Sequence, residues 1–251
     1  MRRILNKLYY GGMSRLFFGG RTGLENADAA LRYFPISDLI RRTDVTLSIL
    51  EVGSGCTGIT PYIPHQVTGL DVSFEGEIAH RLEPVLLSGE SLPFGDSSFA
   101  HVVSVDMLEH VPAARRPAVI RELIRVARER LFLAVPCGKK SEAHDRLLDD
   151  LYRARHGKSY PFLEEHVVNG LPDVEEITGL IRKSANELGK GALIEVRPNV
   201  NLAVREWLTR LWIRSPKAFG LISPLICIFR RLYDFGPCYR SIFIVEIDSG
   251  A

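Results

Sequence analysis

A glycine-rich turn between two short apolar runs is the feature that most constrains this sequence. Residues 48–71 read SILEVGSGCTGITPYIPHQVTGLD. The first apolar run indicates a buried parallel strand, and the glycines after it let main-chain N–H groups approach a ligand without a Cβ in the way. These glycines are Gly53, Gly55 and Gly58. A second strand ends on Asp71, twenty positions after Glu51, the spacing at which nucleotide-binding units place a carboxylate on ribose hydroxyls.

Two families of nucleotide-binding enzyme share this arrangement. Residues 53–58, GSGCTG, match the G-x-G-x-x-G fingerprint of dinucleotide enzymes, so an NAD(P)-dependent oxidoreductase is one candidate. Glu51 favours the other family, because the position two residues before the first glycine is normally apolar in dinucleotide-binding enzymes. An acid there resembles motif I of the class I S-adenosylmethionine (SAM) methyltransferases, E/D-x-G-x-G-x-G. The sequence departs from that motif at Thr57, which stands at the place of the third glycine.

A second stretch supports the methyltransferase resemblance. Residues 88–111 read SGESLPFGDSSFAHVVSVDMLEHV. This stretch is similar to the part of small-molecule SAM methyltransferases that runs from the adenine-contacting turn, through an L-P-F turn and a D-x-S-F strand entry, to an acid and L-E-H. The corresponding residues are 92–94, 96–99, Asp106 and 108–110, in the same order. The chain therefore resembles a class I SAM-dependent methyltransferase of the small-molecule type, with SAM as its cofactor.

The resemblance and the alternation of strands with helices predict one α/β domain over residues 1–251. Its centre is a doubly wound, mostly parallel seven-stranded sheet of the Rossmann-like methyltransferase type. The expected parts are a helical lead-in (1–46), a SAM-binding core (47–136), a substrate-side segment (137–190) and a helical insertion before the last strand (198–240). The substrate-side segment and the insertion each follow a parallel strand, so both should lie over the sheet edge where ligands bind.

Hydrophobic periodicity places the individual elements. Strands after Asp71 are expected at 84–88, 101–106, 131–135, 191–197 and 241–247. Helices are expected at 74–82, 113–129, 141–156 and 173–188, and a loop or short helix at 160–170. Pro35 should begin a second segment within the lead-in.

The resemblance assigns cofactor roles to residues in both motifs. The glycine turn would approach the methionine end of SAM, and Glu51 would help to hold that end through hydrogen bonds around the turn. Asp71 would accept hydrogen bonds from the ribose hydroxyls, and residues 88–90 would lie near the adenine. Asp106 would lie near the transferring methyl and the SAM amino group. The expected cofactor-binding residues are Glu51, Gly53, Ser54, Gly55, Gly58, Asp71, Ser88, Gly89, Glu90 and Asp106.

Two histidines are the candidate catalytic residues. Methyl transfer from a sulfonium needs little beyond an in-line nucleophile, because the leaving thioether is already activated. A general base is required only for a protonated, poor nucleophile such as a sugar hydroxyl. His110 belongs to the L-E-H motif, and His166 follows two glutamates in the segment expected over the site. The alternatives are that His110 only orients the start of a helix and that His166 is a solvated loop residue.

Composition limits the partners. The net charge of +2 and the lack of an N/D-P-P-Y/F tetrapeptide after the fourth strand argue against a nucleic-acid partner. Four cysteines, at 56, 137, 227 and 238, show no C-x-x-C spacing, so no metal site is expected and the thiols should be reduced in a cytoplasmic protein. The longest apolar run, 218–229, has twelve residues, well below the roughly 20 of a spanning helix.

The insertion at 198–240 mixes apolar and basic residues over 43 positions. Four alternatives stay open for it: a lid over a hydrophobic acceptor, a surface that meets anionic lipid at the inner face of the membrane, a homodimer contact, or a packed extension of the core. It loosely resembles inserts in bacterial methyltransferases linked to glycan or lipid-linked saccharide assembly. The expected acceptor is therefore a small molecule, a glycan or a lipid-linked saccharide, methylated at oxygen. A non-catalytic module that binds SAM or S-adenosylhomocysteine is the further alternative.

Overall fold

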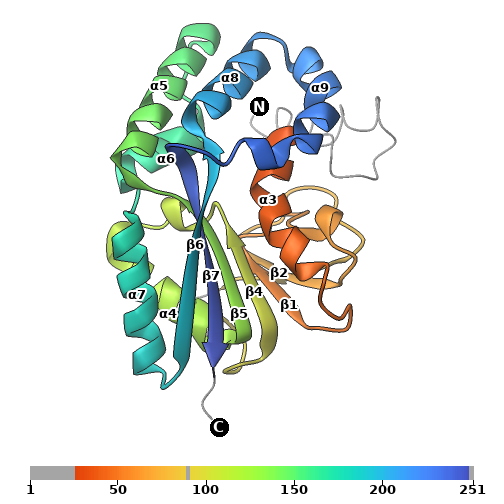
Figure 1. Ribbon diagram of the computed structural model, residues 1–251, viewed down its shortest axis with the longest axis vertical. Coiled ribbons are helices and arrows are strands. Elements are labelled where there is room, and N and C mark those ends of the chain that lie inside the picture. Colours follow the sequence, from red (N-terminus) through yellow and green to blue (C-terminus); the bar gives the residue numbers. More distant parts are fainter. Residues whose placement is uncertain (1–25, 89–90, 249–251) are drawn as a thin grey trace.

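Seven strands form one sheet in the computed structural model, which describes residues 26–88 and 91–248 (Figure 1). Their order is β3-β2-β1-β4-β5-β7-β6. Strands β1 to β5 are parallel, whereas β7 runs antiparallel between β5 and β6. The chain reverses its direction of winding between β1 and β4, which is where open α/β sheets bind their ligands. The predicted Rossmann-like methyltransferase fold is confirmed.

The elements have the following bounds. The strands are β1 (Ile49–Val52), β2 (Val67–Asp71), β3 (Leu82–Leu86), β4 (Phe99–Val105), β5 (Ala127–Pro136), β6 (Gly191–Asn201) and β7 (Cys238–Asp248). The α-helices are α3 (Ala27–Ile40), α4 (Arg116–Val126), α5 (Gly138–His156), α6 (Pro161–Asn169), α7 (Val174–Glu187), α8 (Leu202–Arg214) and α9 (Pro216–Ile228). Short 3-10 helices are η1 (Thr60–Tyr62), η2 (Leu108–His110), η3 (Ala113–Arg115) and η4 (Arg230–Leu232).

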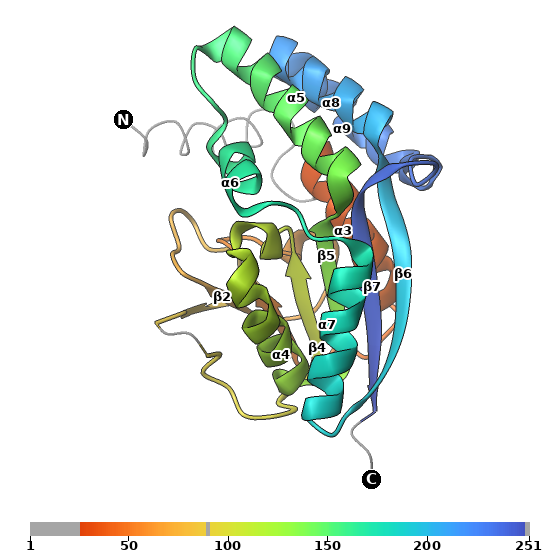
Figure 2. The same cartoon turned by 90° about the vertical axis from the view of Figure 1, so that its left-hand side faces the viewer.

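Helices cover both faces of the sheet, so the central strands are buried on both sides (Figures 1 and 2). Helices α4 and α7 pack on one face, where Ile120 and Ile177 meet Phe243 of β7 in a buried core. On the other face, Ile36 of α3 joins a second core that contains Val103 and Phe132. Apolar runs without alternation, such as residues 131–135 of β5, are typical of a strand buried on both faces.

Helices α5, α6, α8 and α9 lie beyond the end of the sheet at which the parallel strands finish (Figure 1). Residues 138–169 and the insertion therefore lie over the ligand-binding edge, as expected, whereas α7, which also belongs to the segment 137–190, packs on a face of the sheet. Leu208 of α8 and Phe219 of α9 are buried in the same core as α3. One face of the insertion is thus a packed extension of the core.

Two local predictions are wrong. Residues 74–82 form no helix: Gly76 has φ +142°, outside the helical range, and Phe74 and Ile78 pack against the core from an irregular segment. Pro35 lies inside α3 and does not begin a new segment. A proline cannot donate to the carbonyl four residues before it, and that carbonyl, of Leu31, accepts a hydrogen bond from Asn199 Nδ2 at 3.1 Å instead.

Several element bounds also differ from those predicted. Strands β6 and β7 extend further than expected and pair up to Asn201 and Cys238, so the inserted helices begin only at Leu202. Residues 161–169, for which the sequence allows a loop or a short helix, form α6. The third strand begins two residues earlier than predicted, at Leu82.

Lys190 closes the helix-to-strand connection that leads from α4 into β5. Its Nζ donates to the carbonyl oxygens of Ile124, Arg125 and Ala127 at 2.9, 2.9 and 2.7 Å. These carbonyls lie at the C-terminal end of the helix, where a positive charge is also favoured by the helix dipole. A residue that follows α7 thereby fixes the end of α4.

We predict that Lys190→Met lowers the free energy of unfolding by about 1.5 to 3 kcal/mol, because methionine keeps the aliphatic stem and removes a charged hydrogen-bond donor. Urea denaturation measures this change. The matched control is Lys183→Met, since the Lys183 side chain is 72% exposed, and we expect it to alter stability by less than about 0.5 kcal/mol. Equal effects of the two substitutions would contradict the assignment.

Candidate active site

A buried carboxylate organises the glycine turn after β1. Glu51 is completely buried, and its Oε2 accepts a hydrogen bond from the N–H of Ile59 at 2.7 Å. Its Oε1 accepts another from the hydroxyl of Tyr33 in α3 at 2.8 Å. Burial raises the pKa of Glu51 to about 7, although both donors favour the charged form. Glu51 therefore joins the strand, the far side of the turn and α3.

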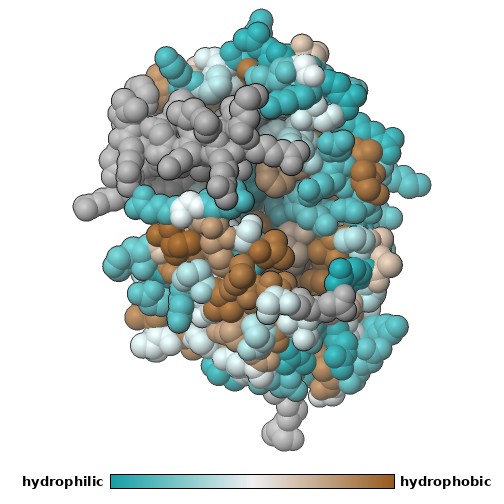
Figure 3. Space-filling model, turned by 180° about the vertical axis from the view of Figure 1, so that it is seen from behind, coloured by the Kyte–Doolittle hydropathy of each residue, from teal (hydrophilic) through white to brown (hydrophobic). Residues whose placement is uncertain are grey.

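The three glycines of the turn all have positive φ, but they are needed for different reasons. A Cβ at Gly58 would overlap Oε2 of Glu51, and one at Gly53 would lie 2.6 Å from Cγ of Met107. A Cβ at Gly55 would meet no atom within 4 Å. Gly53 and Gly58 thus let the protein close on itself, whereas the backbone of Gly55 faces open space. Viewed from behind, the molecule has apolar side chains gathered around a hollow near its middle (Figure 3).

Asp71 lies where the sequence predicts, at the end of β2 beside the glycine turn. Its Oδ2 accepts from the N–H of Gly55 at 2.7 Å and its Oδ1 from the N–H of Val72 at 2.7 Å. The N–H of Ser73 also donates to Oδ1 at 3.4 Å, so about one of the roughly four acceptor positions of a carboxylate stays free for a hydroxyl donor. The geometry is compatible with the predicted role towards ribose.

Ser54 and residues 88–90 are four further predicted cofactor residues. Ser54 is buried, and its hydroxyl donates to the carbonyl of Gly55 at 3.0 Å. Ser88 is exposed just beyond β3. Gly89 and Glu90 lie outside the described residues. The roles of residues 88–90 towards adenine stay predictions.

Asp106 lies directly after β4 with φ +49°, and two arginines hold its carboxylate. Arg240 of β7 binds both oxygens, with Nε to Oδ1 and Nη2 to Oδ2 each at 2.5 Å. Nη1 of Arg32 lies 3.1 Å from Oδ2. Burial alone would raise the pKa of Asp106, but the two guanidinium groups outweigh it and lower the pKa to about 2. Its predicted contact with the SAM amino group stays a prediction.

Helix α6 is fastened to the L-E-H turn, η2, by side chains that the sequence motifs do not single out. Asn169 Nδ2 donates to the carbonyls of Glu109 and His110 at 3.3 and 3.1 Å. Buried Arg116 donates to the carbonyls of Val111, at 3.1 Å, and of Asn169, also at 3.1 Å. These bonds bring the two candidate histidines together.

The rings of His110 and His166 lie with their centroids 4.9 Å apart. His166 is buried, and its Nδ1 is 2.8 Å from Oδ2 of Asp145 in α5. His110 is half-buried, with Nδ1 2.7 Å from Oε2 of Glu165. Burial is the main cause that lowers the pKa of His110, and the neighbouring His166 lowers it further. The carboxylate of Glu165 acts in the opposite direction but does not outweigh them. The expectation of a solvated loop histidine at 166 is wrong, because α6 turns the ring inward.

Asp145 is itself part of a buried network. It accepts from the hydroxyl of Tyr239 at 2.9 Å, and Arg205 of α8 lies 3.0 Å from its Oδ1. Burial would raise the pKa of Asp145, but the hydrogen bond from His166 and the charge of Arg205 lower it. The carboxylate is therefore ionised and fixes the orientation of His166.

Several of these residues carry no sequence signal. Arg32, Asp145, Asn169 and Arg240 come from four separate parts of the chain and belong to neither of the two motif stretches. Arg240 could have been suspected only as a charged residue within an apolar strand. Their roles depend on the pairing of β7 with β5 and on the folding of α5 and α6 over the sheet.

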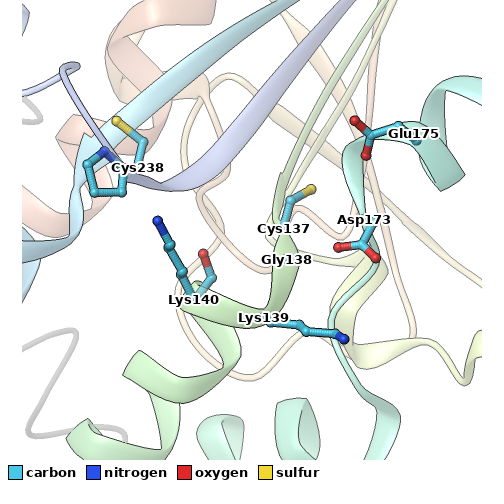
Figure 4. A pocket seen from close by; sticks show the side chains of 9 residues that line it. Cys137, Gly138, Lys139, Lys140, Asp173, Glu175 and Cys238 are labelled. Atoms are coloured by element: carbon cyan, nitrogen blue, oxygen red, sulfur yellow. The ribbon is translucent and has the colours of Figure 1, made fainter.

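A separate surface pocket of about 610 Å³ lies where β5 enters α5. Figure 4 shows Cys238 on one side of it and Asp173 and Glu175 on the other. Its lining in the described structure includes none of the predicted cofactor residues. Burial raises the pKa of Cys137, another lining residue, to about 12, which favours the protonated thiol near neutral pH. The predicted cofactor residues lie instead along the edge formed by β1, β2 and β4.

Comparisons with known proteins concern the fold and one domain. The family model described as "Methyltransferase domain" matches residues 50–135, from β1 to the end of β5. No curated protein sequence gives a significant match.

Solved structures share the fold at low sequence identity. A SAM-dependent methyltransferase from Thermotoga maritima is 16% identical, with a TM-score of 0.52, over 98% of both chains. Phosphoethanolamine N-methyltransferase 2 from Haemonchus contortus, solved in complex with SAM, is 15% identical, with a TM-score of 0.54, over 98% of this chain and 60% of that one.

Residues 50–135 thus match a methyltransferase domain, and the fold is the one that solved SAM-dependent methyltransferases have. The open backbone at Gly55 and the adjacent Asp71 are compatible with SAM as the cofactor. The match to a methyltransferase domain favours methyl transfer over hydride transfer, although the glycine turn also fits the dinucleotide fingerprint. Within the described residues, no helix is long and apolar enough to cross a membrane.

The raised pKa of Glu51 makes a prediction for stability. Its ordinary pKa is 4.5, so between about pH 4.5 and 7 the folded protein holds a proton that the unfolded chain releases. The contribution of Glu51 to the free energy of unfolding is therefore largest below pH 4.5 and is lost as the pH rises to about 7. The stability of wild type relative to Glu51→Gln should fall by about 3 kcal/mol over that range.

Urea denaturation at several pH values measures this difference. Glu187→Gln is the matched control, because the Glu187 side chain is 46% exposed, and its stability relative to wild type should not depend on pH in the same way. A pH-independent difference for Glu51→Gln would show that Glu51 ionises normally in the folded protein.

Proposed function

We propose that this methyltransferase transfers the methyl of SAM to a hydroxyl oxygen of a small-molecule, glycan or lipid-linked saccharide acceptor. The observation that carries the proposal is the position of the His110–His166 pair. His110 lies on the turn that follows Asp106, at the edge of the sheet that also carries the glycine turn, and His166 of α6 lies beside it. A nucleophile that needs deprotonation requires such groups, whereas an amine or thiol acceptor can do without them.

The chain's own residues would hold the cofactor from both sides. The backbone of Gly53 and Gly55 would approach the methionine end, with Glu51 keeping the turn closed, and Asp71 would accept from the ribose hydroxyls. Asp106 would lie beside the amino group, held in place by its arginines. When bound, SAM supplies a methyl carbon already activated by its sulfonium.

His110 and His166 are the residues that we propose for the acceptor's proton. Asp145 holds Nδ1 of His166, so Nε2 is the nitrogen left to take a proton; it has no hydrogen-bond partner among the described residues. In the reaction, the acceptor O–H bond and the S–CH3 bond break and a C–O bond forms. The proton goes to the base, and the sulfur keeps its electron pair as S-adenosylhomocysteine leaves.

The first test of the proposal is calorimetric titration with SAM, S-adenosylhomocysteine and NADH in parallel. We expect the first two to bind and NADH not to bind. Methylation assays with hydroxylated saccharides then test the acceptor class. Binding of NADH alone would overturn the proposal, and methylation of amines but not of hydroxyls would overturn its assignment to oxygen.

We predict that Asp71→Ala lowers the affinity for SAM at least about tenfold, because a charge-assisted hydrogen-bond pair to ribose is worth about 1.5 to 3 kcal/mol. Calorimetry measures the change. Asp96→Ala is the matched control, since the Asp96 side chain is 73% exposed and pairs with Arg125, and its affinity should equal that of wild type. Unchanged affinity in Asp71→Ala would remove this residue from the site.

We further propose that the outer face of α9 rests on an anionic lipid surface. Leu221, Leu225 and Ile228 are 69, 56 and 67% exposed and repeat at helical spacing, so they form one apolar stripe. Phe219 and Ile226 on the opposite face are buried. Three more exposed apolar residues, Phe229, Leu232 and Phe235, follow α9 in the chain.

Charge supports a lipid partner over a second protein copy. Exposed basic residues, Arg214, Lys217 and Arg231, border the apolar stripe on both sides along the chain. An apolar stripe with a basic border is the pattern of helices that lie in the interface of an anionic membrane. Such contact would place the site beside a lipid-linked acceptor.

We predict that vesicles with anionic lipid sediment the protein more than neutral vesicles do, and that salt weakens the effect. The double substitution Leu221→Gln and Leu225→Gln should remove most of this binding. Leu193→Gln is the control, because Leu193 is 70% exposed on β6, away from the stripe. Absence of binding at low salt would leave a lid or a homodimer contact as the role of this face.

A further inference from the structure

Glu109, His110 and His166 form a compact cluster of metal-ligating side chains. One ligand atom from each lies within 4.8 Å of the others, and Nε2 of His166 is 3.9 Å from Oε1 of Glu109. Two ligands about 2.1 Å from a common ion can be up to about 4.2 Å apart. The distance of 3.9 Å between the two buried members, Glu109 and His166, is already within this limit. The half-buried ring of His110 can adjust at the edge of the cluster.

Both histidines are oriented as metal ligands usually are. In metal sites, a ligating histidine commonly donates its other ring N–H to a carboxylate, which fixes the ring and makes the free nitrogen more basic. Here Nδ1 of His166 is paired with Asp145 at 2.8 Å, and Nδ1 of His110 with Glu165 at 2.7 Å. Each ring thus has Nε2 as its second nitrogen.

Two buried atoms of the cluster lack partners. Glu109 and His166 are 1% and 6% exposed. In the described structure, neither Oε2 of Glu109 nor Nε2 of His166 has a hydrogen-bond partner. An unpaired buried carboxylate oxygen and an unpaired buried imidazole nitrogen are costly unless a ligand satisfies them.

The nearby arginines do not take the place of a cation. Arg240 and Arg32 are directed at Asp106, and Arg205 is directed at Asp145. Each guanidinium is therefore matched by another carboxylate. Among residues 26–88 and 91–248, Glu109 has no cationic partner within 4 Å apart from the imidazole of His166.

We propose that Glu109, His110 and His166 bind a divalent transition-metal ion of the Mn²⁺, Fe²⁺, Co²⁺ or Zn²⁺ type. Two imidazoles and one carboxylate suit these ions, whereas Mg²⁺ prefers a shell of oxygen ligands. Cysteine spacing gave no reason to expect a metal, and it could not reveal this cluster, because His166 is separated from the L-E-H motif by more than fifty residues.

The metal site deepens the proposed oxygen methylation and rests on that function for its role. Three protein ligands leave coordination positions free for an oxygen of the acceptor. A bound cation would lower the pKa of a coordinated hydroxyl, so the hydroxyl proton would pass to water and the two imidazoles would act as ligands in place of bases. The acceptor class is then one whose reactive hydroxyl can reach a metal.

Metal binding is tested directly, without methyl transfer. Protein freed of metal with a chelator is titrated with Co²⁺ and followed by calorimetry and by visible absorption, with Zn²⁺, Mn²⁺ and Mg²⁺ in parallel. We expect one Co²⁺ per chain, ligand-field bands in the visible range, and weaker binding of Mg²⁺.

Substitutions locate the site. His110→Ala and Glu109→Gln should each weaken Co²⁺ binding at least about tenfold, and Glu165→Gln should weaken it about tenfold through the loss of orientation. His80→Ala is the control, because His80 is exposed and lies outside the cluster. If a substitution at a buried residue such as Glu109 prevents folding, His110→Ala is the variant to use, because His110 is only half-buried.

The outcomes separate this inference from the proposed function. SAM binding that persists with no stoichiometric Co²⁺ binding, or Co²⁺ binding unchanged in His110→Ala, would overturn the metal site and leave the methyltransferase assignment intact. Co²⁺ binding that the cluster substitutions abolish, in a protein that methylates only amines, would support the site and overturn the assignment to oxygen.

Discussion

The structure around the cofactor edge depends on one buried carboxylate. Glu51 receives a hydrogen bond from Ile59 on the far side of the glycine turn and another from Tyr33 on α3. Because the carboxyl group is removed from water, its two oxygens depend on these two donors for hydrogen bonds. The turn, the first strand and the helix over it are consequently fixed as one unit, and the closed turn leaves Gly55 facing free space.

A second buried group joins the acceptor side to the same edge. Asp106, at the end of β4, is held by Arg240 from β7 and by Arg32 from α3. Asn199 accepts from Nη1 of Arg240 and donates to the carbonyl that Pro35 leaves free. The helix with an internal proline, the long antiparallel strands and the end of β4 therefore support one another through a single polar network.

The sequence predicted the sheet and the cofactor edge, because glycine turns and apolar strands are local patterns. It placed the segment that contains α6 over this edge but did not predict the buried position of His166, since Asn169 and Arg116 act only after the chain has turned back. The helix predicted at 74–82 had suitable spacing at Phe74 and Ile78, but Gly76 decides the backbone there. The ion pairs of Asp106 were also missed, because they join residues more than seventy positions apart.

The position of Arg240 has a consequence for how this protein is made. It lies in the last strand, after the inserted helices, and its partner Asp106 precedes it by 134 residues. A contact of such sequence separation closes late, because a long loop must first be ordered. During synthesis, Arg32 is available to Asp106 before Arg240, so the carboxylate has only one of its two arginines until β7 has been made. The complete polar network around Asp106 therefore forms only after β7 has left the ribosome.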